Sequence, residues 1–170
     1  AAASLPPAGA RPLWLHAVSV GETLAARPLV DALRRQHPAL PLLITTMTPT
    51  GSERVRAIWG DQVLHVYAPY DFPGAVRRFL ARWQPRALVI METELWPNML
   101  AESRRQGLPV MLANARLSER SARGYGRLGA VTRELMGNLS VVAAQDEPTA
   151  VRFRELGVPA ERVVRTGSLK

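Results

Sequence analysis

Short apolar segments alternate with segments of helical periodicity along the chain of 170 residues. Apolar runs of roughly four to eight residues, bounded by turn signals, are typical of strands buried on both faces of a parallel sheet. The connections between them are too long for hairpins. The pattern therefore predicts a doubly wound, Rossmann-like α/β fold with a mainly parallel sheet and right-handed crossovers. The predicted strands span residues 13–20, 40–46, 62–67, 87–91, 110–113, 139–144 and 163–167.

Apolar positions at helical spacing predict helices between these strands. Residues 1–11 are rich in Ala and Pro and are expected to form a flexible leader, whereas residues 12–170 are expected to form a single domain. The leader lacks the pattern of a signal peptide, and no apolar run approaches the roughly 20 residues that span a bilayer. The predicted helices span residues 23–36, 52–59, 72–83, 99–106, 121–136 and 148–156.

The chain contains no cysteine, which excludes disulfides and thiolate metal sites. Its histidines, His16, His37 and His65, do not have metal-ligand spacing, so no metal site is expected. The formal net charge is +8, and every basic residue except Lys170 is an arginine. This surplus favours anionic partners: phosphorylated ligands, a membrane face or nucleic acid. An Arg-favouring genomic composition explains the choice of Arg over Lys equally well.

The stretch from Leu13 to Glu22 is the first candidate for a functional site. Its apolar run, interrupted only by His16 and Ser19, meets Gly21 and Glu22 where a helical pattern starts. In open α/β sheets, ligands bind beyond the carboxyl ends of the strands. We expect Gly21 to allow close backbone approach there and Glu22 to be the catalytic carboxylate. The alternative is that Glu22 is a first-turn acid that complements the helix dipole.

Polar clusters also follow three other predicted strands, at residues 45–51, 92–98 and 114–118. Because the carboxyl ends of parallel strands share one edge of the sheet, we expect these clusters to converge with Glu22. Unpaired buried carboxylates are costly, so Glu92 and Glu94 are expected to bind a polyhydroxylated ligand or to fix the backbone near Glu22. The candidate substrate-binding residues are Ser19, Gly21, Thr48, Thr50, Gly51, Glu92, Glu94, Trp96, Asn114, Arg116 and Ser118.

Two of these clusters also have a purely structural explanation. Glu92 and Glu94 can cap the helix that follows them, and the Thr/Ser-rich turn at residues 45–52 can serve as a loop and helix cap. His16, inside an apolar strand, is more often a satisfied core histidine than a base. Packing is likewise the commoner role for the tryptophans Trp14 and Trp96.

Several well-defined motifs are absent from the sequence. Gly21-Glu22 lacks the second and third glycines of a dinucleotide-binding fingerprint, and there is no phosphate-binding P-loop. No Gly-x-Ser-x-Gly elbow supports a serine nucleophile. The basic residues are dispersed over several helices without interleaved aromatics, so nucleic acid is not an expected partner.

Four segments occur in the same order as in one known family: Trp14–Glu22 (WLHAVSVGE), Thr45–Gly51 (TTMTPTG), Met91–Asn98 (METELWPN) and Asn114–Ser118 (NARLS). From about Trp14 to Lys170, the chain resembles the N-terminal, acceptor-side domain of bacterial Kdo (3-deoxy-D-manno-octulosonic acid) transferase. The resemblance implies the N-terminal half of a two-domain GT-B glycosyltransferase of lipopolysaccharide biosynthesis.

The resemblance further implies transfer of Kdo from CMP-Kdo to the lipid A precursor (lipid IVA) with inversion. Glu22 would be the general base, Glu92 and Glu94 would belong to the same cleft, and no metal or other cofactor would be needed. CMP-Kdo would be held by a C-terminal domain that this chain does not include. The family implies the cytoplasmic face of the bacterial inner membrane, and arginines of the outer helices suit lipid phosphates and an anionic membrane: Arg77, Arg78 and Arg82.

The chain departs from the family pattern at both ends. The Ala/Pro-rich leader stands where the family usually has a membrane anchor, and the sequence ends at Lys170, before any donor domain. We therefore expect a soluble fragment that transfers nothing alone. Two other hypotheses are a GT-B glycosyltransferase with a different nucleotide sugar, and a non-catalytic basic module that binds anionic membrane or nucleic acid.

Overall fold

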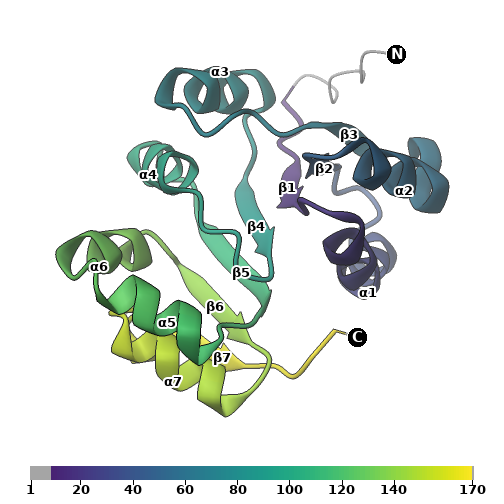
Figure 1. Ribbon diagram of the computed structural model, residues 1–170. Helices are drawn as coiled ribbons and strands as arrows, with labels where there is room; N and C mark the ends of the chain where they lie inside the picture. Colours follow the sequence, from purple (N-terminus) through teal and green to yellow (C-terminus); the bar gives the residue numbers. More distant parts are fainter. Residues whose placement is uncertain (1–8, 170) are drawn as a thin grey trace.

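The computed structural model describes residues 9–169 and contains one seven-stranded sheet (Figure 1). All neighbouring strands are parallel, in the order β3-β2-β1-β4-β5-β6-β7. This confirms the predicted doubly wound α/β fold and each predicted strand. The strands are β1 (Leu13–His16), β2 (Leu42–Thr46), β3 (Leu64–Tyr67), β4 (Ala87–Met91), β5 (Val110–Ala115), β6 (Val141–Ala144) and β7 (Val163–Arg165).

Helices connect consecutive strands and cover both faces of the sheet. Figure 1 shows α1 and α2 together on one side of the sheet, with the later helices on the other side. The helices are α1 (Val20–Gln36), α2 (Pro49–Trp59), α3 (Pro73–Trp83), α4 (Pro97–Arg105), α5 (Glu119–Gly126), α6 (Ala130–Gly137) and α7 (Glu147–Glu155), with short 3-10 helices η1 (Gly60–Gln62) and η2 (Ala160–Arg162).

The core consists of two apolar layers, one on each face of the sheet. Because side chains alternate along a strand, Trp14 faces α3 and α4 while the next residue, Leu15, faces α1 and α2. The first layer includes the fully buried Phe153 of α7, and the second includes Trp59 of α2. This double coverage explains why the central strand β4 is apolar at every position.

Most predicted bounds are off by up to three residues, and two predicted elements differ more from the structure. The first strand ends at His16 rather than at residue 20, because Ser19 adopts an extended conformation and caps α1, which begins at Val20. The predicted helix over residues 121–136 is two helices, α5 and α6. They are separated at Gly129, whose φ of 50° is incompatible with a continuous helix.

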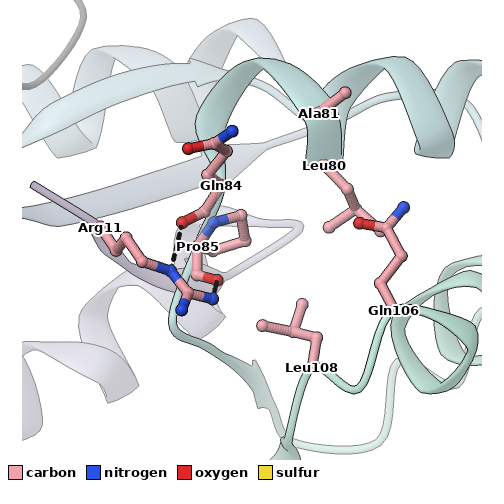
Figure 2. A pocket seen from close by; sticks show the side chains of 7 residues that line it. All are labelled: Arg11, Leu80, Ala81, Gln84, Pro85, Gln106 and Leu108. Atoms are coloured by element: carbon pink, nitrogen blue, oxygen red, sulfur yellow. Dashed lines mark hydrogen bonds between the residues drawn. The ribbon is translucent and has the colours of Figure 1, made fainter. Parts of the chain in front are cut away.

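The start of the domain is fastened to the amino-terminal edge of the sheet. Residues 1–8 of the predicted leader lie outside the described residues, but Arg11 is tied to the turn before β4: its guanidinium donates hydrogen bonds to the carbonyl oxygens of Gln84 (3.2 Å) and Pro85 (3.0 Å). Figure 2 shows Arg11 beside these carbonyls, at the rim of a cavity of about 320 Å³. Among residues 9–169, no helix has the length and apolar character required to cross a bilayer.

Candidate active site

The strand order reverses between β1 and β4, which are adjacent in space but far apart in sequence. Ligands of open α/β sheets bind at such a point, outside the carboxyl ends of the strands. Glu22 lies in the first turn of α1, the helix that follows β1, and Glu92 and Glu94 lie in the turn directly after β4. The negative charges of both β4 acids act on Glu22, so the structure brings together three of the carboxylates singled out in the sequence.

Glu22 lies in the first turn of α1 and is largely buried, with 8% of its surface exposed. One carboxylate oxygen accepts the backbone N–H of Val18 at 2.8 Å, and the other accepts the hydroxyl of Ser19 at 2.9 Å. The Ser19 oxygen in turn caps the N–H of Glu22. This reciprocal arrangement is close to a capping box, so Glu22 stabilises the start of the helix as well as facing the strand ends.

The environment of Glu22 disfavours its ionised form. Burial raises the pKa of the Glu22 carboxyl above its ordinary value, and the hydrogen bonds from Val18 and Ser19 oppose that rise. The nearby charges of Glu94 and Glu92 add to it. A carboxylate whose pKa is raised in this way becomes a stronger base nearer neutral pH, which is the property that a general base requires.

Two non-glycine residues adopt left-handed backbone conformations at the ends of neighbouring strands. The φ angle is 57° at Glu92 and 55° at Asn114, and Glu92 donates its N–H to the carbonyl of Ala113 at 2.9 Å. Asn114 also lies at an irregularity in the pairing of β5 with β6. Strained backbone and bulges of this kind are concentrated at functional sites.

The predicted residues Ser19, Thr48 and Ser118 are helix N-caps: their hydroxyls accept backbone N–H groups in the first turns of α1, α2 and α5. For Thr48 this is the structural role that the sequence left open, whereas Ser19 and Ser118 were predicted only to bind substrate. Gly51 donates its N–H to Thr48 at 3.1 Å, and a Cβ on Gly51 would lie 2.9 Å from the Thr48 hydroxyl. The need for glycine there is explained by packing.

The structure does not require a glycine at position 21 for a close backbone approach. Gly21 lies inside the first turn of α1, without a positive φ, and a Cβ there would meet only the Ser19 hydroxyl, at 3.8 Å. The position of Glu22 is set instead by the cap at Ser19. Sequence reasoning overestimated Gly21 because a glycine beside a strand end is also compatible with an ordinary helical position.

The remaining predicted residues lie around the turn after β4. Trp96 directs its indole N–H to a carboxylate oxygen of Glu94 at 3.1 Å, and its ring is half-buried. The hydroxyl of Thr93 donates to the backbone carbonyl of Arg116, which joins the segments after β4 and β5. The Arg116 residue itself is exposed.

Two residues near this turn carried no recognisable sequence signal. Asp71, in the loop before α3, accepts the backbone N–H groups of Asn98 (3.1 Å) and Met99 (2.7 Å) at the start of α4. Tyr125 of α5 has a phenol whose pKa is raised by burial and by the charge of Glu94. Such contacts depend on the folded arrangement of separate elements, so no local pattern announces them.

The surface cavities are distributed over both edges of the sheet. The cavity in Figure 2 lies at the amino-terminal edge, opposite the strand ends that carry the three acids. A cavity of about 430 Å³ between α1 and α2 is lined by Val20, Thr50 and Arg54, among others. Thr50 thus lines a hollow at the starts of α1 and α2, which Val20, two residues before Glu22, also lines. Within the described part of the chain, no group of three or more His, Asp or Glu residues is arranged to hold a metal ion.

The sequence matches known proteins over its whole length. A family model described as 3-deoxy-D-manno-octulosonic-acid transferase (kdotransferase) matches residues 2–170. A 3-deoxy-D-manno-octulosonic acid transferase of Haemophilus influenzae is 45% identical over 97% of this chain, and that of Bordetella pertussis is 46% identical over 100%. The chain spans only 38% and 40% of the length of these two relatives.

Solved structures show the same fold at low sequence identity. The UDP-GlcNAc 2-epimerase of Neisseria meningitidis, bound to UDP-GlcNAc, aligns with a TM-score of 0.67 at 14% identity, over 94% of this chain and 47% of its own. MurG of Acinetobacter baumannii aligns with a TM-score of 0.61 at 12% identity, over 93% and 45%. Both have the GT-B fold, so this chain has the fold of one GT-B half, as predicted.

The order of the four sequence motifs, the parallel sheet with its acids at the switch point and the match of the family model agree with one another. On this evidence, the chain belongs to the 3-deoxy-D-manno-octulosonic-acid (Kdo) transferase family of glycosyltransferases.

Proposed function

We propose that this chain is the acceptor-side half of an enzyme that transfers Kdo from CMP-Kdo to a hydroxyl of the lipid A precursor with inversion at the anomeric carbon. Glu22 takes the proton of the acceptor hydroxyl as that oxygen attacks the sugar. The observation that carries the proposal is the position of Glu22 at the β1/β4 switch point beside Glu92 and Glu94, with its pKa raised by burial.

An inverting transfer needs one base and one leaving group on opposite faces of the anomeric carbon. A carboxylate within hydrogen-bond reach of the hydroxyl contributes about 10²- to 10⁴-fold to the rate. Both oxygens of Glu22 already accept one hydrogen bond each, but a carboxylate has about four lone-pair sites, so acceptance of the substrate proton remains open. CMP departs with the electrons of the glycosidic bond, and the proposed chemistry requires no metal or other cofactor.

The acceptor is polyhydroxylated and phosphorylated, and the chain offers groups suited to both features. Glu92 lies at a strained position at the end of β4, where hydrogen bonds to sugar hydroxyls can form. Asn114, also predicted to bind substrate, is buried, and its side-chain oxygen accepts the N–H of Leu169 at 3.0 Å. The basic face of α3 suits lipid phosphates and an anionic membrane. On that face Arg77 is bound to Glu102 at 3.1 Å, which makes Arg78 and Arg82 the better candidates for lipid contact.

The test uses the full-length protein whose reading frame contains this chain. Transfer is measured with CMP-Kdo and, in parallel, with UDP-sugars, and Glu22→Gln is compared with the wild type. The proposal predicts transfer from CMP-Kdo alone and a loss of turnover of about 10²-fold or more in Glu22→Gln. Folding is expected to be preserved, because the Gln amide oxygen can accept the Val18 N–H and the amide N–H can donate to the Ser19 hydroxyl. Transfer from a UDP-sugar would identify another GT-B activity, and unchanged turnover would remove Glu22 from the mechanism.

Membrane contact is tested separately with vesicles. Arg78→Glu and Arg82→Glu are expected to weaken binding to phosphatidylglycerol-containing vesicles, since each basic residue near an anionic surface contributes about 1 kcal/mol. Arg104→Glu is the matched control, because Arg104 is an exposed arginine of α4, outside the basic face of α3, and contacts Asn138. Equal effects of all three substitutions would indicate attraction to net charge without a defined face.

A further inference from the structure

The indole of Trp96 connects the packed core to the carboxylate of Glu94. Trp96 is the N-cap residue of α4, yet its side chain makes no cap hydrogen bond. Its Nε1–H instead donates to an oxygen of Glu94 at 3.1 Å. A hydrogen bond to a charged acceptor is among the stronger kinds in proteins, so this contact restricts where the Glu94 carboxylate can lie.

His16 braces the other side of the indole. The two ring centroids are 4.9 Å apart and the planes are inclined by 74°, an edge-to-face contact. His16 is fully buried, and its Nδ1 lies 2.9 Å from the hydroxyl of Thr45 on β2, which also accepts the indole N–H of Trp14 at 2.8 Å. Burial lowers the pKa of His16 to about 4, so the ring is neutral at physiological pH. His16 therefore acts on Trp96 as a fixed aromatic surface.

Asp71 contacts the first turn of α4, the helix that follows its N-cap residue Trp96. Its carboxylate accepts the N–H groups of Asn98 and Met99 at 3.1 and 2.7 Å, and its carbonyl accepts the Asn98 side-chain amide at 2.7 Å. These donors belong to the first turn of α4, where the helix itself supplies no acceptor. The loop before α3 thus fixes the start of α4, and with it the backbone of Trp96.

Glu94, the residue held by this arrangement, acts electrostatically on two titrating groups. Its charge acts on Glu22 of α1 and on the phenol of Tyr125 in α5. The other groups that act on Glu22 are the charge of Glu92 and the hydrogen bonds of Val18 and Ser19. A change in the position of Glu94 therefore changes the electrostatic surroundings of the proposed base.

We propose that Trp96 is a positioning residue: braced by His16 and by Asp71, it holds the Glu94 carboxylate beside Glu22 at the carboxyl edge of the sheet. The catalytic importance of this arrangement rests on the proposed role of Glu22 as the base. The proposal gives Trp96 a task other than that of a stacking platform for sugar.

The first test measures the titration of the Glu22 carboxyl by ¹³C NMR in this chain, and it does not require transfer activity. Trp96→Phe keeps an aromatic ring against His16 and removes the N–H. We expect the pKa of Glu22 to fall toward its ordinary value, because a released Glu94 moves into solvent and its charge acts less on Glu22. An unchanged pKa of Glu22 in Trp96→Phe would overturn the proposal.

The same substitution in a Glu94→Gln background is the control for solvent entry. Gln can still accept the indole N–H but carries no charge, so Trp96→Phe is expected to have no further effect on the pKa of Glu22 there. A fall of the same size in both backgrounds would come from changed burial and would contradict the proposal. Asp71→Ala is the second variant, used if Trp96→Phe does not fold; it keeps the indole, frees the start of α4 and is expected to lower the pKa of Glu22 in the same way.

The second test uses the full-length enzyme. Trp96→Phe is expected to lower kcat roughly ten- to hundredfold with little change in the acceptor KM, and to shift the acidic limb of the pH–rate profile to lower pH. If Trp96 were instead a stacking platform for sugar, neither kcat nor the pH–rate profile should change, since Phe can still stack. If Glu22→Gln retains full activity while the NMR result holds, the proposed base is wrong and the positioning of Glu94 by Trp96 stands.

Discussion

Glu92 and Asn114 lie at adjacent ends of β4 and β5, and both have a left-handed backbone, with φ angles of 57° and 55°. A left-handed conformation costs a residue with a Cβ about 1–2 kcal/mol. We therefore expect the Gly variant at each position to be more stable than the Ala variant by about 1 kcal/mol. Urea unfolding of the four variants measures this difference. The loss of the original side chain is common to the Gly and Ala variants at each position, so it cancels in the comparison.

The matched control is the exposed Arg120 of α5, which has an ordinary helical conformation. At this position the Ala variant is expected to have the larger free energy of unfolding, by about 1 kcal/mol, because Gly is the poorer helix former. If Gly and Ala rank the same way at all three positions, backbone strain at Glu92 and Asn114 is not stored in the native state.

Glu22 is expected to make the stability of the domain depend on pH. Burial raises the pKa of its carboxyl in the folded chain, so between the ordinary value and the folded value the native state binds more protons than the unfolded state. Stability then falls as pH rises through this window. Glu22→Gln does not titrate at this position and so does not lose this stability. The free energy of unfolding of the variant minus that of the wild type should therefore rise from pH 4 to pH 7. An identical pH dependence in both chains would contradict the raised pKa.

The sequence predicts the fold well because periodicity and strand order have one consistent solution. The fully apolar β4 was predicted with its observed bounds, and its burial on both faces explains that success. The predicted strand over residues 13–20 was too long because Ala17, Val18 and Val20 are apolar in either conformation. The Ser19–Glu22 spacing of a capping box is the signal that marks the helix start there.

The candidate site was less predictable than the fold. The sequence places Glu22, Glu92 and Glu94 at strand ends, and the switch-point rule brings them together, as the structure shows. The bracing of α4 by Asp71 depends on a tertiary contact across 27 positions, and nothing in the local sequence encodes it. The left-handed backbone of Glu92 is equally hidden, since glutamate has no preference for positive φ.

His16 is expected to contribute to acid unfolding. Its pKa lies at about 4 in the folded chain against 6.5 in the unfolded chain, so the unfolded state binds more protons between these values. The stability that neutral His16 provides is complete above pH 6.5 and is lost as pH falls to about 4, a difference of roughly 3 kcal/mol. His16→Phe should reduce the pH dependence of the unfolding free energy in this range by that amount.

The comparison of the two chains isolates His16, because His65, whose pKa is lowered by burial and by Arg56, contributes in the same direction to both. Denaturant unfolding at pH 4.5 and pH 7 measures the effect. Parallel pH profiles for the two chains would show that His16 is not held neutral by burial.

Gly51 is expected to be intolerant of substitution for reasons of packing. A Cβ there would lie 2.9 Å from the Thr48 hydroxyl and 3.3 Å from the Thr46 Cβ, where α2 approaches the end of β2. Gly51→Ala should therefore lower the free energy of unfolding by about 1–3 kcal/mol. Gly124 of α5 has no atom within 4 Å of a Cβ, so Gly124→Ala should stabilise by about 0.5–1 kcal/mol. Thermal unfolding of both variants tests the contrast; equal shifts in Tm would contradict it.

Removing the partners of Glu102 is expected to destabilise the domain more than removing Glu102 itself. Its carboxylate, with a side chain only 4% exposed, is 3.1 Å from the guanidinium groups of Arg77 and Arg105, whose side chains are 52% and 69% exposed. Removing both arginines leaves a buried, unpaired charge, so Arg77→Ala with Arg105→Ala should destabilise by about 1–3 kcal/mol. Glu102→Met leaves only two exposed arginines and should cost less. Urea unfolding of the two chains decides the matter, because a larger loss in Glu102→Met would mean that the ion pairs themselves stabilise the fold.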